Sequence, residues 1–378
     1  MSHNTYDAIV LGIGGMGSAA AFELGRRGRR VLGLEQFALG HDRGSSHGHT
    51  RIIRKAYFEH PDYVPLVLRA WERWRDLERR CGRTLLTEHP CLSIGPPDGE
   101  LIAGVRQSAA QHRLLVEALD AAGLRRRYPA FRFSDEYVGL VEPSAGFLYV
   151  DDCVRAHAEE ARKLGAVIRD GEPATSWKAE GSGVIVETTA GRYSAGRLII
   201  TAGPWAGRML GEIGADLTVM RQVVFWLGGD EAALRREAFP IFIAQTPDGD
   251  FYGLPALNAD GVKVARHYGV PELREPSQIV RTISEADEAP VRRFVRAHLP
   301  AADGPVRRAS TCIYTLTADR HFLIDVHPEH PQVIFAAGFS GHGFKFASVM
   351  GEILADLAES GRTDQPIGMF RLGRLRSK

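Results

Sequence analysis

The chain has 378 residues, with 47 lysines and arginines against 46 aspartates and glutamates, so its formal net charge is +1. Because nucleic-acid binding needs a surplus of basic residues on one face, this balance argues against a nucleic-acid partner. No apolar stretch reaches the roughly 18 residues of a membrane span, and the polar N-terminus lacks a signal-peptide pattern, so we expect no membrane partner. The length favours two domains.

The first forty residues predict one β–α–β unit. Residues 6–11 are an apolar run typical of a buried parallel strand, and residues 18–27 have the periodicity of a helix. Residues 31–34 form a second apolar strand, which ends in Glu35. This order within about thirty residues is the unit from which parallel α/β sheets are built.

A GxGxxG motif lies between the first strand and the helix. Gly12 permits a tight turn, Gly14 lets the backbone approach a pyrophosphate, and Gly17 lets the helix pack closely on the strand. The N-terminus of the helix then offers unpaired N–H groups to phosphates. The Glu35 carboxylate can accept hydrogen bonds from ribose hydroxyls, and its charge disfavours a 2′-phosphate. The motif therefore predicts a dinucleotide site but does not separate NAD from FAD.

The rest of the chain alternates helical and strand-like patterns. The predicted helices are residues 63–80, 114–128, 156–164, 289–298 and 344–357. The predicted strands are residues 166–168, 184–188, 192–194, 197–201 and 333–337, and residues 219–263 are strand-like with turns at 228–229 and 248–249.

Nucleotide-binding patterns lie at both ends of the chain and near residue 200, with antiparallel-looking material between them. We therefore expect an α/β fold with a discontinuous Rossmann-type cofactor domain in residues 1–85, 150–217 and 308–378. An inserted α+β substrate domain, built on a mostly antiparallel sheet, is expected in residues 86–149 and 218–307.

Residues 44–54 hold two glycines, three hydroxyl side chains, two histidines and two arginines, which is unusual for a surface loop. If this stretch were helical, Arg51 and Arg54 would share one side. One arginine could then face a flavin and the other a carboxylate. The alternative is a solvated basic loop.

Residues 338–345 form a second glycine loop between a buried strand and a helix. The N-terminus of that helix could stabilise negative charge on a ligand or on a reduced cofactor. Lys345, in the first turn, opposes the dipole of its own helix. This indicates that the lysine has a binding role and does not stabilise the helix. The alternative is a packing helix that carries a chance lysine.

Four other features stay ambiguous from the residues alone. Cys312 lies in an apolar stretch, where a lone cysteine is commonly a core residue. Lys263 lies in an apolar strand, where it either extends outward or is buried for a purpose, and His267 is uninformative by itself. Residues 327–330 favour a surface turn over a metal site. The four cysteines are scattered without metal spacing, which favours a reducing cytoplasm and no metal.

Together these segments resemble the monomeric sarcosine oxidase and N-methyltryptophan oxidase family of D-amino-acid-oxidase-like flavoproteins. The resemblance covers essentially the whole chain. It is densest in residues 44–54, 63–65, 251–255, 312–314, 322–325 and 338–346. The run Gly-His-Gly-Phe-Lys-Phe at residues 341–346 is highly specific to this group.

The resemblance implies a monomeric enzyme that oxidises secondary amino acids, typically N-methylated ones, with FAD and O2, and that releases H2O2. It implies that FAD is attached through its 8α-methyl carbon to Cys312. Arg54 and Lys345 match the pair that binds the substrate carboxylate, and Lys263 matches the lysine that activates oxygen. Two cations suit a carboxylate because charge-assisted hydrogen bonds are strong.

The resemblance assigns further residues to the site. The remaining expected catalytic residues are His47, Arg51, Tyr252, His267 and Tyr314, and Gly341 and Ile243 are expected beside the substrate. The expected FAD contacts are Gly12, Gly14, Gly17, Glu35, Ser45, Thr50, Arg51, Cys312, Gly341, His342, Gly343, Phe344 and Lys345.

The chain departs from the family at a few positions. The family often has His-His-Gly-Asp at residues 46–49, sarcosine oxidase has methionine at Ile243, and Arg266 is atypical. Residues 369–372 look closer to the N-methyltryptophan branch. The substrate is therefore open between sarcosine, a bulkier N-methyl amino acid and a cyclic imino acid such as proline or pipecolate. A flavin dehydrogenase with another electron acceptor, an NAD-dependent dehydrogenase and a non-catalytic flavin-binding protein are further alternatives.

Overall fold

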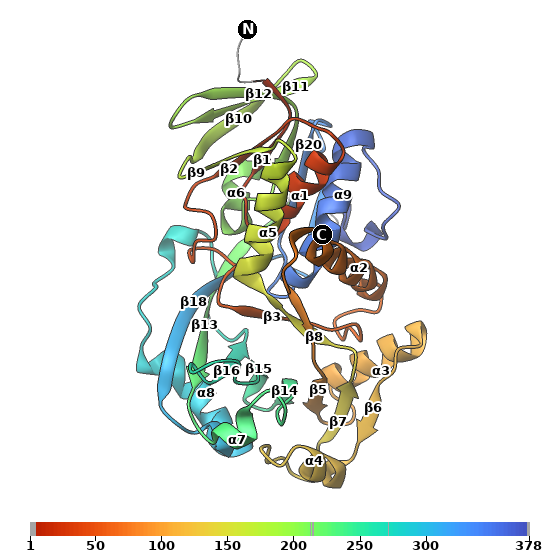
Figure 1. Ribbon diagram of the computed structural model, residues 1–378, viewed down its shortest axis with the longest axis vertical. Coiled ribbons are helices and arrows are strands. Elements are labelled where there is room, and N and C mark those ends of the chain that lie inside the picture. The colour runs from red at the N-terminus through yellow and green to blue at the C-terminus, as the bar shows by residue number, and fades with distance from the viewer. Residues whose placement is uncertain (1–4, 212, 214, 271, 376–378) are drawn as a thin grey trace.

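The computed structural model describes residues 5–211, 213, 215–270 and 272–375. Two sheets lie one above the other along the long axis of the molecule, and the chain passes between them several times (Figure 1). Most helices of the upper region pack on one face of its sheet, and helices of the lower region pack on both faces of its sheet. We call these two regions the upper part and the lower part.

The upper sheet has a parallel centre. β1 (Thr5–Leu11) pairs in parallel with β2 (Val31–Glu35) and β12 (Arg192–Ile200). β9 (Val167–Asp170) extends the sheet beside β2, and β20 (Val333–Ala337) extends it beside β12, both in parallel. The antiparallel additions are β10 (Ala174–Glu180), β11 (Gly183–Thr188) and β19 (Leu323–Val326). The central strands are buried on both faces, as parallel strands usually are.

Three helices pack together against this sheet and form the largest apolar core. They are α1 (Gly15–Arg26), α5 (Val150–Lys163) and α9 (Ala347–Ser360). α2 (Tyr63–Cys81) lies beside α9 and buries Trp74 completely. A three-stranded sheet of β3 (Thr50–Ile53), β8 (Gly146–Tyr149) and β4 (Leu86–Glu88) lies where the two parts meet.

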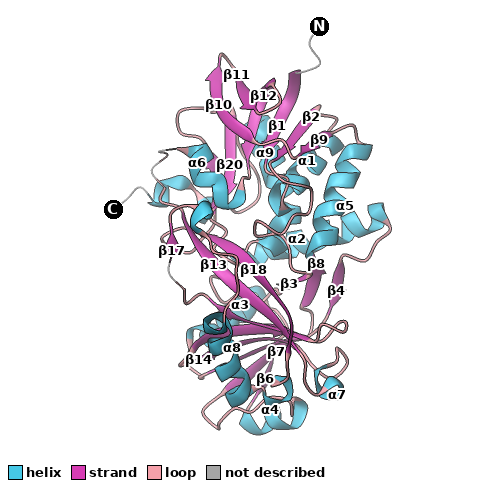
Figure 2. Cartoon of the chain, turned by 90° about the vertical axis from the view of Figure 1, so that its left-hand side faces the viewer, coloured by secondary structure: helices cyan, strands magenta, loops and turns pink. Residues whose placement is uncertain are grey.

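The lower sheet is mostly antiparallel. Within the described residues its path is β17 (Glu272–Leu273), β13 (Thr218–Leu227), β16 (Val262–His267), β15 (Gly249–Leu254), β14 (Ile241–Thr246), β5 (Cys91–Gly95), β7 (Val138–Glu142) and β6 (Glu117–Leu119). β18 (Val306–Leu316) pairs with β13 along its whole length, so residues 308–316 join this sheet. The long β13–β18 ribbon rises toward the upper part (Figure 2).

The alternation of side chains along β15 assigns the two faces of the lower sheet. Phe251 packs against Phe294 of α8 (Glu285–His298), with ring centroids 4.3 Å apart. Tyr252, the next residue, therefore points to the opposite face, toward the upper part. The remaining helices are α3 (Glu100–His112), α4 (Ala121–Arg127), α6 (Ala206–Leu210) and α7 (Glu231–Leu234).

The expected α/β class and the first β–α–β unit are confirmed, although α1 begins at Gly15 instead of residue 18. The helix predicted at 114–128 is wrong. α3 ends at the left-handed Arg113 (φ 54°), then β6 pairs with β7, and Asp120 caps the short α4. The two strands predicted at 192–194 and 197–201 are one strand, β12. The strand-like stretch 219–263 is interrupted by α7.

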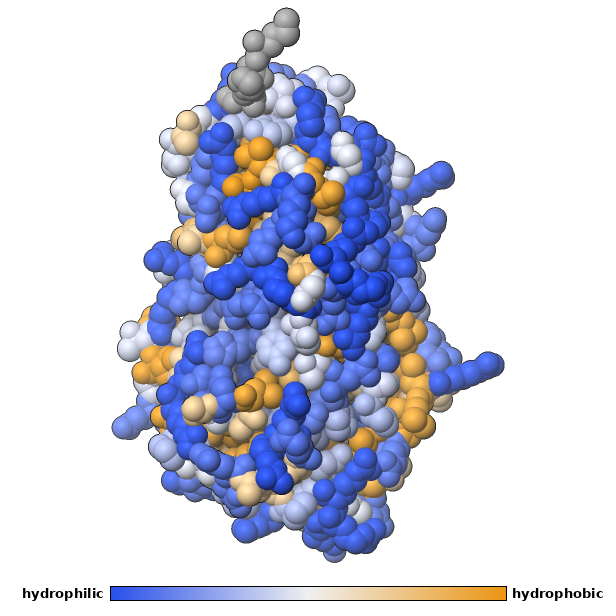
Figure 3. All heavy atoms as spheres, viewed as in Figure 1, coloured by the Kyte–Doolittle hydropathy of each residue, from blue (hydrophilic) through white to orange (hydrophobic). Residues whose placement is uncertain are grey.

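On the face seen in Figure 3, hydrophilic side chains predominate and apolar side chains form separate groups. Leu115 and Val280 are the most exposed large apolar residues among those described, and they lie far apart in the sequence. None of the helices in the described ranges combines the length and the apolar character that a membrane crossing requires.

Replacing Gly17 with alanine should destabilise the protein much more than the same change at Gly14. A Cβ atom at Gly17 would lie 1.8 Å from the Gly12 carbonyl oxygen, whereas one at Gly14 would meet only Ser46 Oγ, at 3.5 Å. Because the first clash can be relieved only by moving backbone, we expect Gly17→Ala to cost about 3 kcal/mol of unfolding free energy. Thermal unfolding of cofactor-free protein measures both variants, and equal melting temperatures would contradict this account.

Candidate functional site

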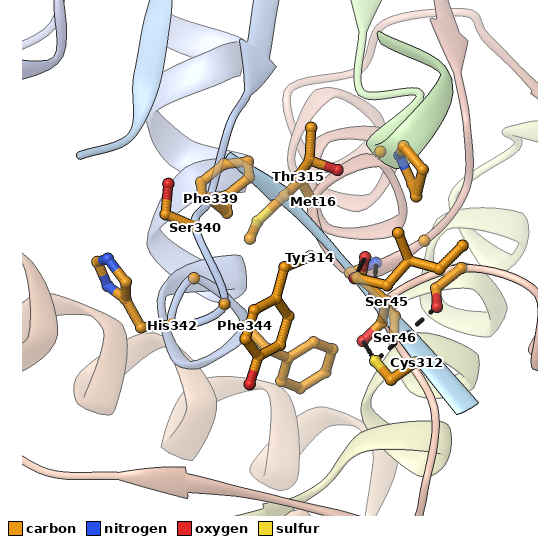
Figure 4. A pocket seen from close by; sticks show the side chains of 18 of the residues that line it. Met16, Ser45, Ser46, Cys312, Tyr314, Thr315, Phe339, Ser340, His342 and Phe344 are labelled. Carbon is orange, nitrogen blue, oxygen red and sulfur yellow. Dashed lines mark hydrogen bonds between the residues drawn. The ribbon is translucent and has the colours of Figure 1, made fainter. Parts of the chain in front are cut away.

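A cavity of about 1040 Å³ lies between the upper and lower parts. It runs from the glycine loop after β1 to the face of the lower sheet that carries Tyr252. Figure 4 shows Cys312, Ser45 and Ser46 together at one end of the view, His342 and Ser340 at the other, and Tyr314 and Phe344 between them. The chain thus brings residues from its first fifty and last seventy positions around one space.

At the upper end the glycine loop is held by its neighbours. Gly12 has a φ of 86°, and the Thr201 hydroxyl donates to the Leu11 and Gly12 carbonyls at 3.0 and 2.9 Å. Glu35 is buried, and its carboxylate accepts hydrogen bonds from the N–H groups of Ile13 (2.9 Å) and Phe37 (3.1 Å). The Glu35 carboxylate is therefore fixed at the cavity wall beside the loop, as a ribose-binding residue requires.

The Cys312 thiol lies on β18 in a polar environment. The Arg51 guanidinium reaches its sulfur at 3.5 Å, and the Ser45 hydroxyl donates to the adjacent Ile313 carbonyl at 2.5 Å. Burial alone would raise the pKa of Cys312, but His47 and Arg51 outweigh burial and lower that pKa to about 7. A large fraction of this thiol is therefore thiolate at neutral pH, which is its nucleophilic form.

Lys263 is buried behind this cluster, which resolves the ambiguity left by the sequence. Its ammonium donates to the Gly48 and Thr50 carbonyls, both at 2.9 Å, and lies 5.2 Å from the Trp226 ring centroid. His49, between the two carbonyls, has a left-handed φ of 65° that turns both of them toward the lysine. Burial lowers the pKa of Lys263 well below its usual value.

The other end of the cavity holds an ion pair between Arg54 and Glu59. Arg54 donates to Glu59 Oε2 at 2.6 Å and to the Ala56 carbonyl at 3.2 Å. Although burial would raise the pKa of Glu59, the charge of Arg54 leads a set of cations that lower it to about 2. Glu59 is thus ionised at neutral pH and paired with Arg54.

Lys345 is the second cation at this end, and we call Arg54 and Lys345 the cation pair. Its ammonium donates to the His342 carbonyl at 2.6 Å and to the Tyr57 hydroxyl at 3.2 Å. Burial, together with the charge of Arg54, lowers the pKa of Lys345 to about 7. The Trp74 indole fixes the backbone of Lys345 by donating to its carbonyl at 2.8 Å.

An aromatic wall faces the cation pair from the lower sheet. Tyr252 lies on β15, His267 on β16 and Tyr314 on β18, with His267 Nδ1 and the Tyr314 hydroxyl 3.2 Å apart. Ile243 lies opposite Tyr252 in the β14–β15 register. Burial lowers the pKa of His267 to about 4, so its ring is neutral at pH 7. Gly341 has a φ of 82°, and a Cβ atom there would lie 2.4 Å from the Tyr314 ring.

Most residues predicted from the sequence line this cavity. These are Gly12, Gly14, Glu35, Ser45, His47, Arg51, Arg54, Ile243, Tyr252, His267, Cys312, Tyr314, Gly341, His342, Gly343, Phe344 and Lys345. Gly17, Thr50 and Lys263 lie behind the wall, where Gly17 packs on Gly12 and Thr50 presents its carbonyl to Lys263.

The condition that residues 44–54 are helical is not met. Arg51 lies on the strand β3 and Arg54 just after it, and the two arginines reach Cys312 and Glu59. One local expectation was wrong, because Lys345 lies in a 3₁₀ turn, Phe344–Phe346, that precedes α9, and not in the first turn of the α-helix. The sequence reasoning missed Glu59 and Tyr57. The sequence signal for these two residues was that both lie within five positions of Arg54.

Known proteins match this chain from end to end. The FAD dependent oxidoreductase family matches residues 7–357. Monomeric sarcosine oxidase from Streptomyces avermitilis is 43% identical over 377 residues, which are 98% of each chain. N-methyl-L-tryptophan oxidase from Escherichia coli O139:H28 is 37% identical over 374 residues, which are 98% of this chain and 99% of its own. Among solved structures, NikD, an unusual amino acid oxidase essential for nikkomycin biosynthesis, is 28% identical, with a TM-score of 0.87 and 97% of each chain covered.

Proposed function

We infer the function of this chain from its family. The chain belongs to the FAD dependent oxidoreductase family. The resemblance to sarcosine and N-methyltryptophan oxidases is confirmed at 36–43% identity over nearly the full chain. The protein is an FAD-dependent enzyme that oxidises N-methyl amino acids, and we propose sarcosine as the representative substrate. The observation that carries this proposal is a cavity that joins a dinucleotide loop to a buried cation pair.

The residues around the glycine loop fit FAD. Gly12 and Gly14 leave the cavity wall free of side chains, and Glu35 presents its carboxylate beside them. FAD, when bound, supplies the two-electron acceptor for oxidation of the substrate C–N bond. We propose that residues 1–85, 150–217 and 308–378 hold the cofactor and that residues 86–149 and 218–307 shape the substrate site.

The charge balance at the cation pair supports a carboxylate substrate. Arg54 and Lys345 carry up to two positive charges, and Glu59, paired with Arg54, supplies one negative charge. Burial, followed by the charge of Arg54, lowers the pKa of Lys345, and Glu59 offsets this only in part. A substrate carboxylate restores the balance and forms charge-assisted hydrogen bonds with both cations. The protein thereby fixes one end of the substrate.

The aromatic wall then orients the reacting amine. His267 is neutral at pH 7 and so adds no cation beside the substrate nitrogen. Tyr252, Tyr314 and the Gly341 backbone enclose the space between the cation pair and Cys312. We propose that the amine reacts in its neutral form and that the resulting imine is hydrolysed by water. The N-methyl carbon then leaves as formaldehyde.

Peroxide release from a panel of secondary amino acids tests this function. We expect sarcosine, N-methyltryptophan or proline to bleach the flavin without oxygen and to yield peroxide with oxygen. The matched amines without a carboxylate are dimethylamine, N-methyltryptamine and pyrrolidine, and kcat/KM for them should be lower by on the order of a hundredfold, as when a buried charge loses its partner. Bleaching without peroxide would identify a dehydrogenase, and no bleaching by any panel member would contradict the function.

We propose that FAD is attached to the chain through a thioether between Cys312 and its 8α carbon. The support is the pKa of about 7, which leaves the thiol partly ionised inside the cavity. Cys153 offers a contrast, because burial raises the pKa of that thiol well above its usual value and it lies in the upper core.

Acid precipitation should therefore leave the yellow colour with the wild-type protein and with Cys153→Ser. The Cys312→Ser variant should release its flavin into the supernatant, because a hydroxyl is too weak a nucleophile to form the link. Absorbance at about 450 nm of pellet and supernatant measures the partition. Flavin that leaves the wild type on precipitation would contradict the covalent link.

We propose that Lys263 promotes reoxidation by O2. Its side-chain nitrogen is held by two carbonyls at 2.9 Å, and in the protonated state its positive charge would stabilise a developing superoxide. The Thr50 and Gly48 carbonyls keep the lysine in place without neutralising its charge.

Replacing Lys263 with methionine should slow flavin reoxidation by roughly a hundredfold, a usual cost of losing one preorganised charge. Anaerobic reduction by substrate should change much less, because Lys263 does not line the substrate cavity. Lys55→Met is the matched control, since Lys55 also lies over a tryptophan, Trp71, but is only partly buried. Stopped-flow absorbance separates the half-reactions, and equal losses in both would exclude the oxygen role.

We also propose that the enzyme is a monomer in the cytoplasm. The name of the sarcosine oxidase relative includes the word monomeric. All four cysteines are free thiols, which suits a reducing compartment.

A further inference from the structure

Both members of the cation pair contact one buried tyrosine, Tyr57. This tyrosine belongs neither to the sequence motifs nor to the proposed catalytic residues. Tyr57 lies three residues after Arg54 and is fully buried. We propose that Tyr57 is a positioning residue that sets the place of Arg54 with its ring and the place of Lys345 with its hydroxyl. This inference rests on the proposed function, because the object being positioned is the carboxylate site.

The ring of Tyr57 is a common platform for the two cations. The Arg54 guanidinium carbon lies 4.3 Å from the ring centroid, and the Lys345 ammonium lies 5.0 Å from it. Cations over an aromatic face are attracted by its negative quadrupole, more strongly when water is excluded. The two charges, which repel each other, are therefore held against one surface.

The platform itself is fixed on several sides. The Tyr63 ring stacks on Tyr57 with centroids 4.6 Å apart, and the Phe346 ring meets it edge-on at 5.4 Å. The Ser108 hydroxyl donates to the Tyr57 carbonyl. A fully buried ring with these contacts has little room to move. We therefore expect the ring to restrict where the two cations can lie.

Hydrogen bonding fixes the direction in which the Tyr57 hydroxyl points its proton. His342 Nε2 lies 3.1 Å from the Arg320 carbonyl, which can only accept, so Nε2 carries the ring proton. Burial lowers the pKa of His342 to about 3, so its ring is neutral and Nδ1 is an acceptor. The Tyr57 hydroxyl therefore donates to His342 Nδ1, at 2.6 Å.

The oxygen of the same hydroxyl is then free to accept from Lys345, at 3.2 Å. The lysine also donates to the His342 carbonyl, so two of its three N–H bonds have acceptors among the described residues. With two bonds fixed, the third N–H has one direction left. Tyr57 thus favours the charged form of the ammonium and restricts the direction of its remaining donor.

Removing only the hydroxyl separates this role from simple packing. In Tyr57→Phe the ring remains under Arg54, while Lys345 loses an acceptor and becomes harder to protonate. A hydrogen bond to a charged group is worth enough to lower the pKa of Lys345 by about one unit. A carboxylate binds best when Lys345 is protonated, so affinity is present below that pKa and is lost as pH rises through it.

The test is calorimetric titration of the purified flavoprotein with acetate, a carboxylate without a titrating amine. For the wild type, the affinity for acetate should fall as pH rises, with a midpoint near pH 7. For Tyr57→Phe the midpoint should move down by about one pH unit, with affinity at pH 7 lower by roughly fivefold, as the protonated fraction of Lys345 falls. KM for the amino-acid substrate should rise while kcat changes little. The other groups near Lys345 that titrate or carry charge are Arg51, Arg54, Glu59, Cys91, His267 and His342.

Tyr63→Phe is the matched control. It removes a neighbouring buried hydroxyl, which bonds His321 Nδ1 at 3.0 Å and touches neither cation. Its acetate midpoint should equal that of the wild type even where its melting temperature falls. Wild-type acetate binding with an unshifted Tyr57→Phe midpoint would overturn the positioning role alone. Absence of acetate binding in every protein would overturn the carboxylate site and this role together.

Discussion

The arrangement of the site depends on two buried cations, Arg54 and Lys345, of which one is paired with the carboxylate of Glu59. Burying an ion is costly unless a partner and hydrogen bonds compensate it. Arg54 has Glu59 at 2.6 Å, whereas the hydrogen bonds of Lys345 to the described residues go to neutral acceptors, a carbonyl and a hydroxyl. Burial, followed by the charge of Arg54, lowers the pKa of Lys345. The proposed carboxylate ligand would bring the negative charge that Lys345 lacks.

The same arrangement explains why the site lies where segments distant in the sequence converge. Arg54 and Tyr57 come from the segment after β3, Lys345 comes from the turn before α9, and the aromatic wall comes from the lower sheet. The buried Glu142 accepts from the N–H groups of Lys55 and Ala56 at 2.7 and 3.0 Å and so anchors the segment that carries Arg54. The cations are thereby held by rigid structure on both sides of the cavity.

The sequence predicted those features that depend on local patterns. The β1–α1–β2 unit follows from short-range periodicity and from glycines whose spacing has one physical use. Contacts between distant residues gave no such pattern. Lys263 meets carbonyls 213 and 215 positions away, and Ser45 bonds a carbonyl 268 positions away. The helix predicted at 114–128 was wrong because its apolar residues give no sign of the break between the short strand β6 and α4, and the helix α3 before it was not predicted.

The β13–β18 ribbon has a mechanical consequence. Cys312 lies on β18, which belongs to the lower sheet, whereas the glycine loop that receives the far end of the cofactor belongs to the upper sheet. If the proposed thioether forms, a flavin seated on that loop would be a covalent tether across the gap between the two sheets. Such a tether would couple the unfolding of the two parts, so that the cofactor would add to the thermal stability of the whole chain.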